Sequence, residues 1–146
     1  MAGLTQPGIV PISINAAADL TGKRGYLVAV NSSGLVAVAS SAGQKVVGVL
    51  MDEPAAAGRP ATVAYMGRVS VRAGSGGFSA GDLLKANASG LAVAASLAVT
   101  DTSDGGSATD PLIGSYVFGV ALEDAAANEY GDVLVTHAGA VATTAA

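Results

Sequence analysis

A Gly-x-Ser-x-Gly pattern at residues 77–81 is the first candidate for chemistry in this 146-residue chain. In hydrolases the pattern holds a nucleophilic serine, here Ser79, on a sharp turn between a strand and a helix, and a histidine supplies the base. The residues that follow, 82–85, have the pattern of a strand and not of a helix. Short patterns also match by chance. We therefore predict that Ser79 lies in an ordinary turn and is not catalytic.

His137 is the single histidine of the chain. Histidine serves as a general base in many enzymes, and Asp132 is near it in the sequence. In the internal repeat described below, however, the counterpart of His137 is Tyr65, which indicates a strand position that holds a partly buried polar ring. The chain has no cysteine and no tryptophan, so the inventory for an active site is poor. We predict a structural role for His137.

Three aspartates at Asp101, Asp104 and Asp110 suggest a calcium loop. An EF-hand needs oxygen ligands at alternate positions, then a glycine, and a glutamate at position twelve. The three aspartates follow a different spacing, so we interpret the segment as a solvated loop, with weak cation binding as the alternative. The glycine-rich residues 74–77 lack the Gly-Lys-Ser/Thr ending of a phosphate-binding loop. We predict no catalytic residue, no cofactor and no metal site, and expect that the chain is not an enzyme.

Charge and composition argue against several classes of partner. The net charge is −4 and the seven lysine and arginine residues are scattered, whereas nucleic-acid binding needs a basic stripe. The chain has no run of the ~18 apolar residues that a membrane helix requires, and its N-terminus lacks the pattern of a signal peptide. We expect a soluble product of the cytoplasm without nucleic-acid or membrane partners. A charged content of only 12% indicates that other subunits cover part of the surface.

Residues 25–40 recur at residues 81–96, with 8 identities in 16 positions and no gap. Each copy has two short apolar segments joined by Asn-x-Ser-Gly, in which the asparagine bonds its own backbone and the glycine takes a positive φ. The sequence therefore predicts two β-hairpins, with positive φ at their turn glycines, Gly34 and Gly90. The two Asn-x-Ser sequons are explained in the same way, as turn residues.

The strand pattern continues after each hairpin and predicts an all-β fold. We expect a β-sandwich or barrel of about ten short strands, built from two internal repeats. The repeats span about residues 25–72 and 81–142 of a single β domain at residues 15–146. About 15 extra residues in the second copy place an insert loop at residues 97–115.

Residues 1–14 stand outside this repeat. Prolines prevent a helix there, while the isoleucines and valine favour burial. Two interpretations remain open: a frayed terminus followed by an edge strand, or an extended N-terminal arm that lies on a partner.

The repeats resemble a family of small decoration (cement) proteins of tailed-bacteriophage heads. The phrases VVGVL…PAAAG…ATV in the first copy and AGDLLKA…GLAVAA in the second carry the resemblance. It covers about residues 9–136, and the insert at residues 97–115 departs from the more compact pattern of the family.

The resemblance implies a non-enzymatic structural protein on the outer capsid surface of the virion, made in the host cytoplasm. It would form a homo-oligomer, with a trimer favoured, and cement adjacent major capsid protein subunits. The arm would add a strand to a capsid sheet edge. The predicted contact residues are Leu4, Pro7, Ile9, Val10, Pro11 and Ile12. The alternative is a phage tail or surface carbohydrate-binding adhesin, for which the four tyrosines offer few stacking rings.

Overall fold

A computed structural model describes residues 8–95 and 115–140, and these residues form strands and turns without a helix. The all-β prediction is confirmed, with nine strands in the described residues where about ten were expected. In this part of the chain no helix is long and apolar enough to cross a membrane. The strands are β1 (Val10–Asn15), β2 (Leu27–Val30), β3 (Val36–Val38), β4 (Gly48–Leu50), β5 (Pro60–Arg72), β6 (Leu83–Ala86), β7 (Ala92–Ala94), β8 (Tyr116–Ala121) and β9 (Tyr130–Ala140).

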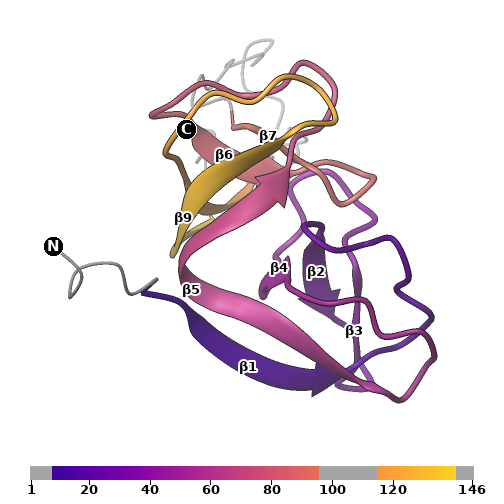
Figure 1. The fold of residues 1–146 in the computed structure, drawn as a ribbon. Helices are drawn as coiled ribbons and strands as arrows, with labels where there is room; N and C mark the ends of the chain where they lie inside the picture. The colour runs from indigo at the N-terminus through magenta and orange to yellow at the C-terminus, as the bar shows by residue number, and fades with distance from the viewer. Residues whose placement is uncertain (1–7, 96–114, 141–146) are drawn as a thin grey trace, which may run out of the picture.

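Strand β5 joins the two halves of the fold (Figure 1). The first half of this 13-residue strand pairs with β4 and β1, and its second half pairs with β9. The strands form one antiparallel sheet in the order β3-β2-β4-β5-β9-β8-β6-β7, with β1 beside β5. Strands β2 to β5 and strands β6 to β9 therefore have the same neighbours in the two halves.

The two hairpins have the same register. Val28 of β2 pairs with Val38 of β3, and Leu84 of β6 pairs with Ala94 of β7, positions that are 56 residues apart in the sequence. The predicted hairpins are thus present. The limits of the predicted repeats stay a prediction, and most of the predicted insert loop lies outside the described residues.

In each half the sheet curls until its two edge strands meet, β1 with β3 in the first half and β5 with β7 in the second. The parallel bridges Ala16↔Val36 and Ala73↔Ala92 make these two contacts. Because side chains alternate along a strand, each curled half encloses its own apolar side chains. The first core contains Ala16, Leu20, Val28, Val36, Leu50, Ala61 and Val63. The second contains Val71, Ala73, Phe78, Leu84, Ala92, Phe118, Ala121, Ala125 and Val133, and it extends to Leu27, Val49 and Ala64 of the first half.

Strand β1 lies on the first half of β5 along its whole length. The second half of β5 lies on β9 in the same way, since Ile12 pairs with Val63 where Val69 pairs with Val133. The edge-strand interpretation is therefore confirmed for residues 10–15, which belong to the sheet of their own chain. An arm at residues 1–7 stays a prediction, because these residues lie outside the described part.

Candidate functional site

Ser79 lies in the turn that leads from β5 to β6. Its main-chain N–H donates to the Asp82 carboxylate at 2.9 Å, and the Asp82 N–H donates to the Ser79 carbonyl at 3.0 Å. Strand β6 begins at Leu83, so a strand and not a helix follows the turn. The prediction of an ordinary turn is confirmed, and the geometry differs from that of a hydrolase nucleophile.

Both ring nitrogens of His137 contact tyrosine residues. Nδ1 lies 2.7 Å from the Tyr116 hydroxyl, and Nε2 contacts the main-chain carbonyl of Tyr65. Because a carbonyl only accepts, Nε2 carries a proton, and in the neutral ring Nδ1 accepts the proton of the Tyr116 hydroxyl. The ring also stacks on Tyr65, with centroids 4.8 Å apart. These contacts occupy both nitrogens within the fold, as a structural role requires.

Burial of Tyr116 raises the pKa of its hydroxyl, and the nearby Tyr65 adds to the effect. The Tyr116 hydroxyl therefore stays protonated and continues to donate to His137 well into the alkaline range.

The match of His137 with Tyr65 is off by two residues. The Thr62 carbonyl accepts a hydrogen bond from the residue after β4, and the Asp132 carbonyl accepts one from the residue after β8. Asp132 therefore takes the place of Thr62, and by the same count Val135 takes the place of Tyr65. Strand β9 has a register shift against β8 beyond this point, and His137 lies in it with a φ of 53°. Because β9 has extra residues in this irregularity, the alignment from sequence placed His137 opposite Tyr65, two residues too late.

The two sequon asparagines are turn residues, as predicted. The Asn31 side-chain carbonyl accepts the main-chain N–H groups of Ser33 and Leu35 at 2.9 and 3.0 Å. Asn87 makes the same two bonds to Ser89 and Leu91, with the same lengths. Both asparagines therefore hold their hairpin turns closed.

The predicted acidic loop at Asp101, Asp104 and Asp110 lies outside the described residues. Among the residues that the structure does describe, no group of three or more histidine, cysteine, aspartate or glutamate side chains could hold a metal ion.

The predicted contact residues lie in or beside β1, except for Leu4 and Pro7, which lie outside the described residues. Val10 is 49% exposed and pairs with Met66, which is 41% exposed. We call this pair the β1–β5 patch. Ile9 and Ile12 pack instead against the second and the first core. Pro11 is exposed on the same strand. Of the predicted contact residues that the structure describes, Val10 and Pro11 are thus exposed, and Met66 extends the apolar surface beside Val10.

A cleft of about 670 Å³ opens between the second half of β5 and the segments that precede β2 and end β4. We call it the β5 cleft. Sequence reasoning missed it, because its residues come from separate segments and no local pattern joins them. Its lining residues are Ile9, Arg24, Gly25, Leu50, Met51, Arg68, Val69, Ser70, Tyr130 and Asp132.

Among the residues that the structure describes, Asp132 is the one carboxylate that lines the β5 cleft, and it already has partners within the fold. Its Oδ1 accepts the Ser70 hydroxyl at 2.7 Å, while its Oδ2 lies 2.9 Å from Nε and 2.8 Å from Nη2 of Arg68. The Ser70 hydroxyl, and then Arg68, lower the pKa of Asp132 below its ordinary value. The carboxylate is therefore ionised at neutral pH and is balanced by Arg68. Arg24 forms no ion pair with any described residue.

The remaining acidic residues are also engaged with the chain. Each one that the structure describes accepts a hydrogen bond from a main-chain or side-chain donor: Asp19, Asp52, Glu53, Asp82, Glu123, Asp124, Glu129 and Asp132. The cations are less engaged, since Arg68 alone forms an ion pair within the described residues. Of the two cations that line the cleft, Arg24 therefore has no carboxylate partner among the described residues.

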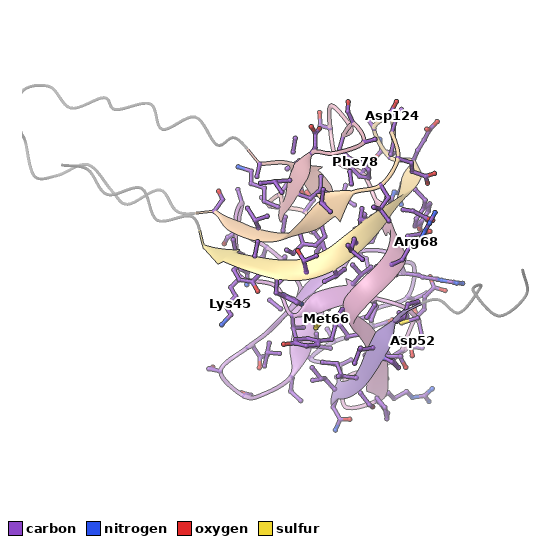
Figure 2. All side chains as sticks on the ribbon, turned by 90° about the vertical axis from the view of Figure 1, so that its left-hand side faces the viewer. Lys45, Asp52, Met66, Arg68, Phe78 and Asp124 are labelled. Carbon is purple, nitrogen blue, oxygen red and sulfur yellow. The ribbon has the colours of Figure 1, made fainter. Side chains whose placement is uncertain are left out.

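Two further cations, Lys23 and Arg72, lie over the ring of Tyr26. The Lys23 ammonium lies 4.8 Å from the centroid of the Tyr26 ring, and Cζ of Arg72 lies 5.8 Å from it. Figure 2 shows Arg68 and Asp52 on one side of the molecule, whereas Lys45 projects from the opposite side. Lys45 therefore lies away from the cleft, whose lining cations are Arg24 and Arg68.

No protein-family model matches the sequence, and no curated protein sequence matches it. The structure is similar to the crystal structure of the N base of the head fiber gp8.5 of bacteriophage phi29, with a TM-score of 0.59. The match covers 92% of this chain and 99% of that chain, at 17% sequence identity. The likeness is one of fold.

Proposed function

We propose that this chain is a non-enzymatic structural protein of a tailed-phage head. The observation that carries the proposal is the likeness to a head fiber base along nearly the whole of both chains. The sequence resemblance to head decoration proteins points the same way. The two candidates for catalysis support it as well, because Ser79 lies in a turn and His137 is held by two tyrosines.

In this proposal the protein binds the outer capsid surface and cements adjacent major capsid protein subunits, as a homo-oligomer in which a trimer is favoured. The β1–β5 patch is the described surface that suits the contact. Val10 and Met66 are paired apolar side chains on an exposed part of the sheet, and their burial against a capsid subunit would remove apolar surface from water. Many copies on one particle would add avidity to a modest affinity per site.

Co-sedimentation with undecorated expanded capsids tests the proposal, and light scattering gives the mass of the free protein. The informative variant is the double substitution Val10→Glu with Met66→Glu, and Val30→Glu is its matched control. Val30 is exposed to a similar extent, 47%, but lies at the end of β2. We expect saturable binding that the double variant loses and the control keeps. Unchanged binding by the double variant would remove the patch from the contact, and no binding by the wild type would contradict the function.

A truncation tests the arm, and the structure sets its limit. Removing the chain up to Ile12 would delete half of β1 and its pairing with β5. The deletion should therefore end at Pro7, which leaves the strand intact. Loss of capsid binding in this truncated but folded protein would place Leu4 and Pro7 in the contact, and full binding would exclude them.

The adhesin alternative depends on an open aromatic ring. Three of the four tyrosines are engaged, Tyr26 by Lys23 and Arg72, and Tyr65 and Tyr116 by His137. Tyr130 is 53% exposed at the β5 cleft, although its hydroxyl donates to the Arg24 carbonyl. A single ring is a small stacking surface for a sugar. Binding on a glycan array without capsid binding would favour the adhesin over the head protein.

A further inference from the structure

The second half of β5 has one paired edge and one edge that faces the β5 cleft. The Ala73 N–H donates to the Glu129 carbonyl, on the side of β9, whereas the Arg72 N–H donates to the Gly25 carbonyl, on the opposite side. Main-chain groups alternate in direction along a strand. The N–H and C=O groups of Arg68 and Ser70 therefore point away from β9, as those of Arg72 do.

This edge is paired at its two ends and open between them. At one end the residue after β4 donates to the Thr62 carbonyl, and at the other end Arg72 donates to Gly25. Between these points, no main-chain hydrogen bond joins Arg68 or Ser70 to a described residue across the cleft. Both residues line the cleft. An unpaired strand edge of this kind is a template for an added strand.

The matching edge of β1 is closed to such pairing. Strand β1 lies on β5 as the second half of β5 lies on β9, so Pro11 and Ser13 hold the positions of Arg68 and Ser70. Pro11 has no N–H, and proline on an edge strand is a common barrier to strand addition. One edge is therefore blocked, whereas its counterpart in the second half remains open within a cleft.

The walls of the β5 cleft indicate what kind of strand would fit. Side chains of an added strand would alternate between two faces. One face would meet Val69 and Met51, which are apolar and only partly buried. The other face of the added strand would lie toward Arg68 and Arg24. Because Ser70 and Arg68 already satisfy Asp132, a carboxylate on the added strand would find Arg24 without an acidic partner among the described residues.

We propose that the β5 cleft binds an extended peptide segment, which adds a strand to the edge of β5 at Arg68 and Ser70. The segment carries apolar side chains at alternate positions and a carboxylate between them that pairs with Arg24. This proposal does not depend on the phage-head assignment, because peptides test the cleft directly in the isolated full-length protein.

The test uses a library of capped hexapeptides with valine at alternate positions and glutamate, glutamine or lysine between them. Binding is followed by amide chemical shifts and by hydrogen exchange on the isotope-labelled protein. We expect the glutamate peptides to shift the Arg68 and Ser70 amides and to slow their exchange by about tenfold or more. The glutamine peptides should bind about fivefold more weakly, since they lack the carboxylate that forms the ion pair with Arg24. No binding by any peptide, equal binding of glutamate and glutamine peptides, or binding of oligosaccharides alone at the cleft would overturn the proposal.

Substitutions at matched positions test the edge itself. Ser70→Pro removes the N–H that faces the cleft and should abolish peptide binding. Ser13→Pro makes the same change at the matching position of β1, outside the cleft, and should bind normally. If Ser70→Pro does not fold, amide hydrogen exchange of the wild-type protein with and without peptide tests the site instead. If the peptide slowed exchange at Ser13 as much as at Ser70, the proposed site would be wrong. Arg24→Gln should lower the affinity for the glutamate peptides to that for the glutamine peptides.

Discussion

Gly34 and Gly90 occupy the same position in two hairpin turns, with φ angles of 76° and 77°, but only Gly90 is enclosed. These angles confirm the positive φ that the sequence predicted for both. A Cβ at Gly34 would meet open space, whereas a Cβ at Gly90 would lie 2.3 Å from Cγ1 of Val38. The Gly90 carbonyl also accepts the Leu27 N–H at 2.8 Å. The turn of the second hairpin thus packs on the first half of the fold, and the turn of the first hairpin does not.

Alanine at these two glycines should therefore have unequal costs. Gly34→Ala adds only left-handed backbone strain, and we expect it to lower the free energy of unfolding by about 1 kcal/mol. Gly90→Ala adds the same strain and also forces Val38 to move, so we expect about 2–4 kcal/mol. Urea denaturation of the two variants and the wild type measures the difference. Equal costs would show that the second turn does not support the contact between the halves.

Two other glycines permit close approach of neighbouring strands. A Cβ at Gly48 would lie 2.2 Å from the Ala64 carbonyl oxygen, and a Cβ at Gly119 would lie 2.2 Å from that of Leu134. Because the obstacle is backbone, a side-chain rotation cannot relieve it. We expect Gly48→Ala and Gly119→Ala each to cost more than about 3 kcal/mol.

The control for these two variants is Gly8→Ala, since a Cβ at Gly8 would have nothing within 4 Å. Thermal and urea unfolding of the three variants measure the costs. If Gly48→Ala were as stable as Gly8→Ala, the close pairing of β4 with β5 would be wrong.

Local chemistry explains which parts of this fold could be predicted from sequence. Asn31 and Asn87 each close a turn with bonds to the next few residues, so the hairpins depend on short segments that are easily recognised. An edge strand was one of the two interpretations for β1, but its equivalence to the second half of β5 was not predicted, because the likeness is confined to Ile-Ser-Ile and Val-Ser-Val at residues 12–14 and 69–71. Strand β5 belongs to both halves of the fold, so no break in the sequence marks where the first half ends.

The β5 cleft could not be predicted for a different reason. Arg24 and Arg68 come from distant segments, and each has the character of an ordinary surface cation in its own segment. The two arginines come together because β5 continues beyond its pairing with β4, and this arrangement is set by tertiary packing. The irregularity of β9 near His137 is also a tertiary feature, and it displaced the predicted match with Tyr65.

Asp132 should make stability depend on acidic pH. The Ser70 hydroxyl and then Arg68 lower its pKa below the ordinary value of 3.8. A lowered pKa in the folded state contributes stability that is present above the ordinary value and is lost as the pH falls through the lowered one. We expect less than about 1 kcal/mol, because Arg68 is 61% exposed and its pairing is screened by solvent. Urea midpoints from neutral pH down to about pH 2 should fall less for Asp132→Asn than for the wild type.

Two further substitutions separate the causes of this pH dependence. Ser70→Ala removes the larger cause and should reduce the acid-induced loss of stability more than Arg68→Gln does. The reverse order would show that the ion pair, and not the hydroxyl, holds the Asp132 carboxylate in its charged form.

Tyr116 should titrate later than an ordinary tyrosine, because burial raises the pKa of its hydroxyl above 10.0. A raised pKa in the folded state contributes stability that is present below the ordinary value and is lost as the pH rises through the raised one. Ultraviolet absorbance of tyrosinate during alkaline titration should therefore contain a late component that Tyr116→Phe removes and Tyr130→Phe keeps. Tyr116→Phe also leaves Nδ1 of His137 without its donor, so we expect it to cost about 1 kcal/mol at neutral pH. A late component that survives in Tyr116→Phe would contradict this environment, and with it the hydrogen bond that holds His137 in place.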